Sequence, residues 1–268
     1  MTSGVLADEV ALALVTDGEL ELEGRLVDAS NTTLRAVVTL DGVERRCVYK
    51  PIRGERPLWD FPDGTLAGRE VSAYLVSVAA GWGIVPPTVL RDGPLGPGAC
   101  QLWIDEPDEA EELVGFVPSR RIPKGWCRVA SARDEDGRPY ALAHADDPRL
   151  GRMAVFDAVV NNADRKGSHV ICDGTGRVYG VDHGVCFHVD PKLRTLLWGW
   201  AGTPLPEEFV DELSALRASL AGTLPETLAT YITPAEIGAL VVRVDRLLTS
   251  GSYPEPDYDW PPLPWPPI

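Results

Sequence analysis

The alternation of apolar and polar residues in the first hundred positions predicts a small antiparallel sheet. Leucine and glutamate alternate over residues 19–23, as expected for a strand with one face in the core. Strand-like runs occur at five places: residues 19–23, 34–40, 44–49, 88–90 and 99–104. Asp41-Gly42 is a typical hairpin turn between the second and third runs, so we expect these strands to pair antiparallel.

Apolar residues at helical spacing predict helices on both sides of residue 105. Residues 65–80 repeat apolar side chains at helical intervals, and Gly81 suits the end of that helix. A short helix is expected at residues 5–15 and a β-hairpin at residues 170–181. Further helices, each with a proline at or near the start, are expected at residues 148–160, 206–219, 224–231 and 234–249.

In two stretches the apolar residues repeat at neither helical nor strand-like spacing. Residues 105–140 are acidic and then rich in proline, glycine and arginine, and they predict no definite element. Residues 253–268 contain seven prolines, which excludes a regular helix. This tail is either disordered or an extended strap whose Trp260 and Trp265 pack on the rest of the protein.

Composition narrows the class of protein. With 268 residues, 44% of them hydrophobic and 24% charged, the chain can bury a sizeable core. The net charge of −15 disfavours binding to nucleic acid or to an anionic membrane surface. We expect no transmembrane segment, because no run of 18 apolar residues occurs, and the first residues do not resemble a signal peptide. The five scattered cysteines form no CxxC pair, which favours reduced thiols and a cytoplasmic location.

Two aspartates carry the first chemical signal. Asp164 and Asp182 lie 18 positions apart (182 − 164), each in a turn-like segment beside an apolar run. A kinase needs one such carboxylate near the attacking hydroxyl and a second that holds the metal bridging the ATP phosphates. Lys166, close to the first, would balance charge on the moving phosphoryl group. The alternative interpretation is that Asp164 caps a turn and that Asp182 is an ordinary strand-end residue.

Lys50 and Glu70 add to this signal. Lys50 ends the third expected strand, and Glu70 lies one turn into the following helix. In kinases a strand lysine contacts the α- and β-phosphates, and a helix glutamate pairs with it. Alone, the two would be a surface lysine and a helix-face glutamate. Their order before Asp164 and Asp182 predicts an ATP site.

The metal ligands are less clear from the sequence. His169 lies five positions after Asp164, where a second metal ligand is expected beside Asp182. Magnesium prefers oxygen ligands, and an imidazole suits manganese better. Two alternatives stay open: His169 binds Mg²⁺ or Mn²⁺ through nitrogen, or Ser168 or a water has taken that role.

Ser30 and Asn31 belong to a polar loop between the first two strands, residues 28–33. Backbone N–H and hydroxyl groups in such a loop can cover nucleotide phosphates. The loop contains no glycine, and a plain hairpin turn explains it equally well.

These residues together resemble the phosphatidylinositol 3-/4-kinase-like superfamily, in particular a small actinobacterial group, with the bacterial HipA-type kinases as more distant relatives. The resemblance implies an α+β, two-lobed protein-kinase-like fold: an antiparallel-sheet N-lobe (1–105), a mainly helical C-lobe (106–252) and a Pro/Trp-rich tail (253–268). It also implies that Gln101, Leu102, Trp103 and Ile104 contact the adenine. It rests on five segments: Tyr49-Lys50-Pro51, Arg69-Glu70, Val85-Pro86-Pro87, 161–169 and 181–184.

The sequence therefore predicts an ATP- and metal-dependent phosphotransferase that acts on an unknown protein or small polar acceptor. Its expected residues are Asp164 and Lys166 for catalysis, Asp182 and His169 for the metal, and, for the nucleotide, Lys50, Glu70, Ser30, Asn31 and 101–104. Two alternatives stay open, a nucleotide-binding pseudokinase or regulatory protein and an enzyme that transfers AMP.

Overall fold

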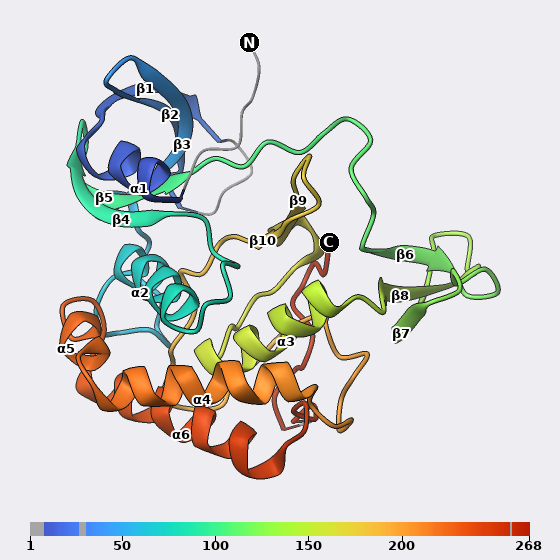
Figure 1. Cartoon of the computed structure of the whole chain (residues 1–268). Coiled ribbons are helices and arrows are strands. Elements are labelled where there is room, and N and C mark those ends of the chain that lie inside the picture. Colours follow the sequence, from blue (N-terminus) through green and yellow to red (C-terminus); the bar gives the residue numbers. More distant parts are fainter. Residues whose placement is uncertain (1–7, 27–30, 258) are drawn as a thin grey trace.

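A five-stranded antiparallel sheet forms the first part of the computed structural model, which describes residues 8–26, 31–257 and 259–268. Its strands lie in the order β1-β2-β3-β5-β4 (Figure 1). Asp41 and Gly42 have φ angles of 50° and 77°, the positive values that a two-residue hairpin needs, so the predicted turn joins β2 to β3. The strands are β1 (Glu19–Arg25), β2 (Leu34–Leu40), β3 (Val43–Pro51), β4 (Thr88–Gly93) and β5 (Gly96–Leu102).

Helix α1 (Asp8–Asp17) covers one face of this sheet (Figure 1). It packs the buried Leu14 and Val15 onto Ala36 and Val38. Ala36 and Val38 alternate with exposed or half-buried neighbours along β2, so the period of two in the sequence matches the buried face. A short 3-10 turn, Ile52–Gly54, follows β3.

Helix α2 (Leu66–Ala79) lies between the sheet and the later helices (Figure 1). Thr65 caps its start, because the threonine hydroxyl accepts a hydrogen bond of 2.9 Å from the Gly68 N–H. The helix is buried nearly all round its first two turns, including the charged Arg69 and Glu70. Two charged side chains buried side by side on a helix each require partners from neighbouring segments.

Four more helices build the largest core: α3 (Pro148–Val160), α4 (Glu207–Ala221), α5 (Leu224–Leu228) and α6 (Pro234–Ser250). Asp147 caps α3, and Thr233 and Glu236 form a capping box at the start of α6. Phe156 of α3 and Leu213 of α4 belong to the same buried cluster. All four lie close to their predicted positions. Among the described residues, no helix is long and apolar enough to span a membrane.

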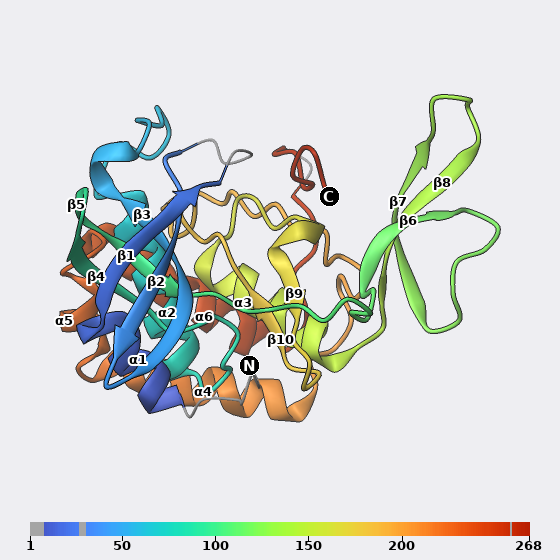
Figure 2. The same cartoon turned by 90° about the horizontal axis from the view of Figure 1, so that it is seen from above.

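A second sheet, which the sequence pattern did not predict, interrupts the part expected to be mainly helical. Its strands β6 (Val114–Pro118), β7 (Trp126–Arg133) and β8 (Pro139–Ala145) lie in the order β6-β8-β7 and project away from the helices (Figures 1 and 2). The pattern hides these strands because a register shift between Arg128 and Ala130 breaks the alternation.

The hairpin β9 (Val170–Cys172) and β10 (Val178–Gly180) forms as predicted. The tail is an extended strap in its described residues: the Thr195 N–H donates to the Pro262 carbonyl over 3.1 Å, and the Gly167 N–H to that of Pro267 over 2.8 Å. Trp260 packs under the guanidinium of Arg194, 4.3 Å from its ring centre. The packing expected of Trp265 is wrong, because this side chain is 87% exposed.

Candidate active site

Three of the predicted residues meet directly. The Nζ of Lys50, near the end of β3, contacts Oε1 of Glu70 on α2 and lies 2.8 Å from Oδ1 of Asp182, just after β10. The second oxygen of Glu70 accepts a hydrogen bond of 3.0 Å from the His183 N–H. Glu70 therefore ties the lysine of the sheet to the segment that carries Asp182.

The charges of this group support one another. Burial alone would lower the pKa of Lys50, but the carboxylates of Asp182 and Glu70 outweigh it and raise that pKa above the usual value. The ammonium of Lys50 in turn holds the pKa of Asp182 well below its usual range. Asp182 keeps 53% of its side chain exposed, so a charged carboxylate is presented at the surface of a cavity.

The backbone aims Asp182 into this position. Its φ is 60°, in the left-handed region, which aspartate tolerates better than most residues. The Val181 N–H just before it donates to the His169 carbonyl over 3.0 Å. The following Gly184 lies against α2, where an added Cβ would stand 3.4 Å from the Cβ of Leu66.

Asp164 and Lys166 lie on the loop that follows α3. Asn161 ends the helix with left-handed φ and ψ of 54° and 53°. The side-chain oxygen of Asn162 accepts a bond of 2.9 Å from the Asp164 N–H, and Lys166 Nζ lies 2.9 Å from Oδ2 of Asp164. Burial raises the pKa of Asp164, and Lys166 opposes this shift.

Arg165 connects this loop to the Asp182 segment, and the sequence analysis gave it no role. Its fully buried guanidinium pairs with Asp157 of α3 at 2.9 Å and donates to the carbonyls of His169 (3.2 Å) and Val181 (3.1 Å). It also lies 2.7 Å from Nε2 of His183. One sequence signal was available, because Asp157 is an acidic residue inside the apolar stretch of α3.

His169 meets Asp182, as expected of a ligand pair. It ends the 3-10 turn Gly167–His169, and its Nε2 lies 3.4 Å from Oδ2 of Asp182. Burial lowers the pKa of His169 to about 4, so the ring is neutral at neutral pH and able to donate a lone pair. Its Nδ1 is buried and has no hydrogen-bond partner among the residues that the structure describes.

The donor set of carboxylate and imidazole fits a divalent ion only in part. No group of three or more His, Cys, Asp and Glu side chains able to hold a metal occurs within the described parts of the chain. Magnesium and manganese sites in kinases take one or two protein ligands and complete their coordination with phosphate oxygens and water. Asp182 and His169 suit that kind of site.

Two adjoining cavities surround these residues. The first, of about 360 Å³, is lined by Lys50, Glu70, Asp164, Lys166, His169 and Asp182, together with Asn31. The second, of about 700 Å³, has a mixed lining that includes the apolar Val48 and Ile171. Lys50, His169 and Asp182 line both, so the charged Lys50 and Asp182 and the neutral His169 stand at the junction of the two cavities.

The predicted adenine-contacting segment lines the larger cavity. The side chain of Gln101 bonds to the Thr88 hydroxyl over 2.8 Å. The N–H groups of Leu102 and Trp103 donate to the carbonyls of Pro87 and Arg46, over 2.9 and 3.0 Å, and Ile104 lies beyond the end of β5.

Of the predicted phosphate-covering pair, Asn31 lines the smaller cavity, and its side-chain oxygen accepts a bond of 2.8 Å from the Arg56 N–H. Ser30 lies outside the described residues.

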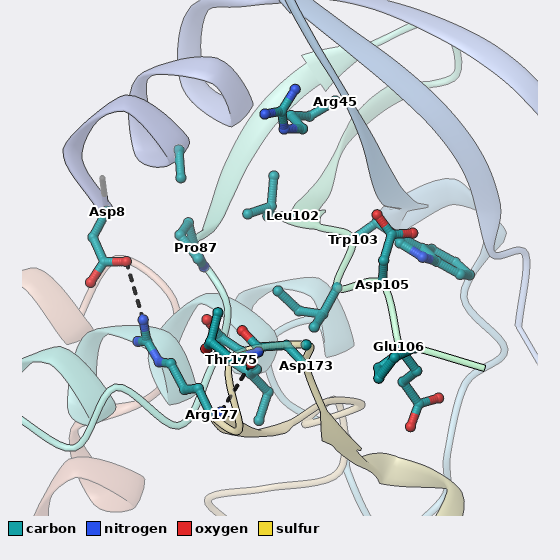
Figure 3. A pocket seen from close by; sticks show the side chains of 15 residues that line it. Asp8, Arg45, Pro87, Leu102, Trp103, Asp105, Glu106, Asp173, Thr175 and Arg177 are labelled. Atoms are coloured by element: carbon teal, nitrogen blue, oxygen red, sulfur yellow. Dashed lines mark hydrogen bonds and ion pairs between the residues drawn. The ribbon is translucent and has the colours of Figure 1, made fainter. Parts of the chain in front are cut away.

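A third hollow, of about 390 Å³, lies beside the same segment (Figure 3). It shares the residues from Leu102 to Glu106 with the larger cavity. Asp8 of α1 and Arg177 of the β9–β10 turn both line it and form an ion pair of 3.4 Å on one side. None of the predicted catalytic or metal residues lines this hollow, but Leu102, Trp103 and Ile104 of the predicted adenine-contacting segment do.

The fold of the chain is kinase-like. It is similar to the crystal structure of the Golgi casein kinase, with a TM-score of 0.51 and 13% sequence identity over 93% of this chain and 79% of that chain. No protein-family model matches the chain. It is 51% identical over 262 residues to protein Rv2133c of Mycobacterium tuberculosis, which covers 95% of this chain and 94% of that protein. The chain belongs to the same family as Rv2133c.

Proposed function

We propose that the protein is an ATP- and divalent-metal-dependent phosphotransferase whose acceptor is a protein or a small polar molecule. The observation that carries this proposal is the meeting of Lys50 with both Glu70 and Asp182, at a cavity that Asp164 also lines. This meeting supports the proposal, because phosphoryl transfer from ATP needs a cation beside the phosphates, a carboxylate for the metal and a carboxylate near the attacking hydroxyl.

In this proposal the larger cavity receives the adenosine, and the smaller one receives the phosphates. Lys50 supplies the cation beside the phosphates, and Glu70 restricts where its ammonium can go. Because the Leu102 and Trp103 N–H groups already donate within the protein, polar adenine contacts would fall to carbonyls of this segment and to Ile104. The five-stranded sheet and the helices would act as the two lobes of a kinase.

Asp182 and His169 are the residues that would hold the divalent ion. When bound, such an ion neutralises charge on the phosphates and thereby stabilises the transition state. The imidazole favours Mn²⁺ more than Mg²⁺, so both ions need testing.

Asp164 would accept the proton of the acceptor hydroxyl or orient that hydroxyl for attack. It lines the smaller cavity, and the Asn162 side chain fixes its backbone. Lys166, 2.9 Å from the Asp164 carboxylate, keeps a positive charge where the phosphoryl group would pass.

The superfamily resemblance to phosphatidylinositol kinases and HipA-type kinases is part of this proposal, but an inositol phosphate acceptor is disfavoured. The segment after Gly184 carries two basic residues that could bind such a headgroup. Lys192 is 6% exposed and lies 2.8 Å from Asp60, and Arg194 stacks on Trp260. Both charges are therefore engaged inside the protein, which supports a different acceptor.

The test is transfer from labelled ATP in the presence of Mn²⁺ or Mg²⁺, with a cell extract as the source of acceptor. Asp164→Ala should lower transfer by about 10²–10⁴-fold, the usual contribution of a general base, while nucleotide binding changes little. Lys50→Met should weaken nucleotide binding itself. Asp211→Ala, an exposed change on α4, is the control.

Unchanged turnover by Asp164→Ala would contradict the mechanism. Nucleotide binding without any transfer, by wild type in either metal, would identify a pseudokinase. Mass spectrometry of the modified acceptor separates added phosphate from added AMP, and added AMP would replace the kinase assignment.

A further inference from the structure

The projecting sheet, which we call the arm (residues 114–145), is firmly attached at its base (Figures 1 and 2). Leu113, just before it, and Leu142 of β8 belong to the main hydrophobic core. The His144 ring accepts a bond of 3.0 Å from the Gly199 N–H and lies 4.4 Å from the ring of Trp200. The rest of the arm extends away from the helices, so its outer surface is available to a partner.

The arm carries a concentration of positive charge. Residues 113–133 contain five basic side chains and no acidic one. The three acidic residues of the arm, Asp134, Glu135 and Asp136, lie in the β7–β8 turn, where Asp134 and Asp136 pair with Arg138. All five are exposed, and within the described residues none of them forms an ion pair with a carboxylate. The whole chain has 25 basic and 40 acidic residues, so the part outside residues 113–133 has 20 basic and 40 acidic residues. The five are Arg120, Arg121, Lys124, Arg128 and Arg133.

The fold gathers several of these charges together. Arg128 and Arg133 of β7 pair with Ala143 and Pro139 of β8. These two partners lie four positions apart on one strand, so both arginines belong to the same face of the sheet. The Arg128 guanidinium also donates to the Ser119 carbonyl over 3.1 Å, which brings the basic β6–β7 connection beside that face.

The arm begins at the candidate active site. A Cβ added to Gly167, in the loop that carries Asp164 and Lys166, would lie 3.6 Å from a methyl group of Val114, the first residue of β6. A chain bound along the arm therefore ends near the mouth of the smaller cavity.

We propose that the basic surface of the arm is a docking site for an acidic segment of a polypeptide. Such a segment is attracted to the arm and repelled by the acidic remainder of the protein, so the arm alone would capture it. A nucleic acid or an anionic membrane is disfavoured, since either would also present its charge to the surrounding acidic surface. The idea that the docked segment belongs to a phosphate acceptor rests on the proposed function. The docking itself does not depend on that function.

The experiment measures the fluorescence anisotropy of a fluorescein-labelled peptide of ten Glu-Gly repeats at low salt, without ATP or metal. The wild type should bind it, and added salt should weaken binding because the contacts are exposed. The variant Arg120→Glu/Arg121→Glu/Lys124→Glu should raise the Kd by about tenfold or more. Circular dichroism confirms that each variant is folded.

Single substitutions provide a matched control. Arg121→Glu should weaken peptide binding, whereas Arg246→Glu, an equal charge reversal on the exposed side of α6, should not. Equal binding by the wild type and the triple variant overturns the proposal. The proposal is also overturned if a labelled single-stranded oligonucleotide, or phosphatidylserine vesicles, bind more tightly than the acidic peptide through the same three residues. Because no ATP is present, these outcomes do not depend on phosphotransfer.

Discussion

Replacing Arg165 with methionine should destabilise the protein more than any exposed charge deletion. The guanidinium is fully buried, and its removal leaves the carboxylate of Asp157, also 0% exposed, without a cation. The remaining donors to that carboxylate are Asn162 Nδ2 at 3.0 Å and the Thr195 hydroxyl at 3.1 Å. These neutral groups only partly offset the buried charge.

The size of the effect follows from this arrangement. Breaking a buried ion pair by removing one partner typically costs about 3–5 kcal/mol. The whole free energy of unfolding of a domain is about 5–15 kcal/mol, so about a fifth or more of it is at risk. The carbonyls of His169 and Val181 lose a donor in the same change, which places the expected value toward the upper end.

Urea unfolding followed by tryptophan fluorescence measures the change. Arg217→Met is the matched control, because its ion pair with Asp245 is exposed and should contribute about 0–1 kcal/mol. The double variant Arg165→Met/Asp157→Leu removes both buried charges and should recover much of the lost stability. If Arg165→Met costs no more than Arg217→Met, or if the double variant is as unstable as the summed single variants, the reasoning is refuted.

Two further predictions concern the pH profile and the packing around Arg165. Burial raises the pKa of Asp164, and Lys166 opposes that shift, so the rate of phosphate transfer should decline as the pH falls through this raised pKa. Lys166→Met should move the decline to higher pH. Initial rates across a pH series test this, and a move of the decline to lower pH contradicts it. Gly180→Ala would place a Cβ 2.9 Å from Arg165 Nη2 and should cost about 1–3 kcal/mol in a urea titration, whereas Gly174→Ala meets nothing within 4 Å and serves as the control. Equal midpoints for the two alanine variants would contradict the packing argument.

Much of the fold could be predicted from local sequence signals. Helix α3 runs from Pro148 to Val160, the range predicted from its apolar face and from the asparagine pair that follows it. The β2–β3 hairpin was predictable because Asp41 and Gly42 adopt positive φ readily. In contrast, the arm was missed. A register shift between Arg128 and Ala130 breaks the alternation in β7, and both faces of β8 are buried over residues 141–144, so its sequence does not alternate.

The candidate site was predictable where a residue type and its position in the chain carry the chemistry, as for Lys50 and Glu70. Arg165 and Asp157 were missed because their importance lies in a buried contact between α3 and a later loop. Spacing along one chain does not show such a contact. The different exposure of Trp260 and Trp265 has the same origin, since contacts with Lys192 and Arg194, from a distant segment, cover Trp260 and not Trp265.

The path of the tail has a practical consequence for the handling of this protein. Pro266 and Ile268 line the smaller cavity together with Asp164, and the Pro267 carbonyl accepts a bond from the loop that carries this residue. A purification tag joined after Ile268 would therefore begin in the wall of the cavity and obstruct it. A tag at the other end precedes α1 instead, and assays intended to find the acceptor should use that design.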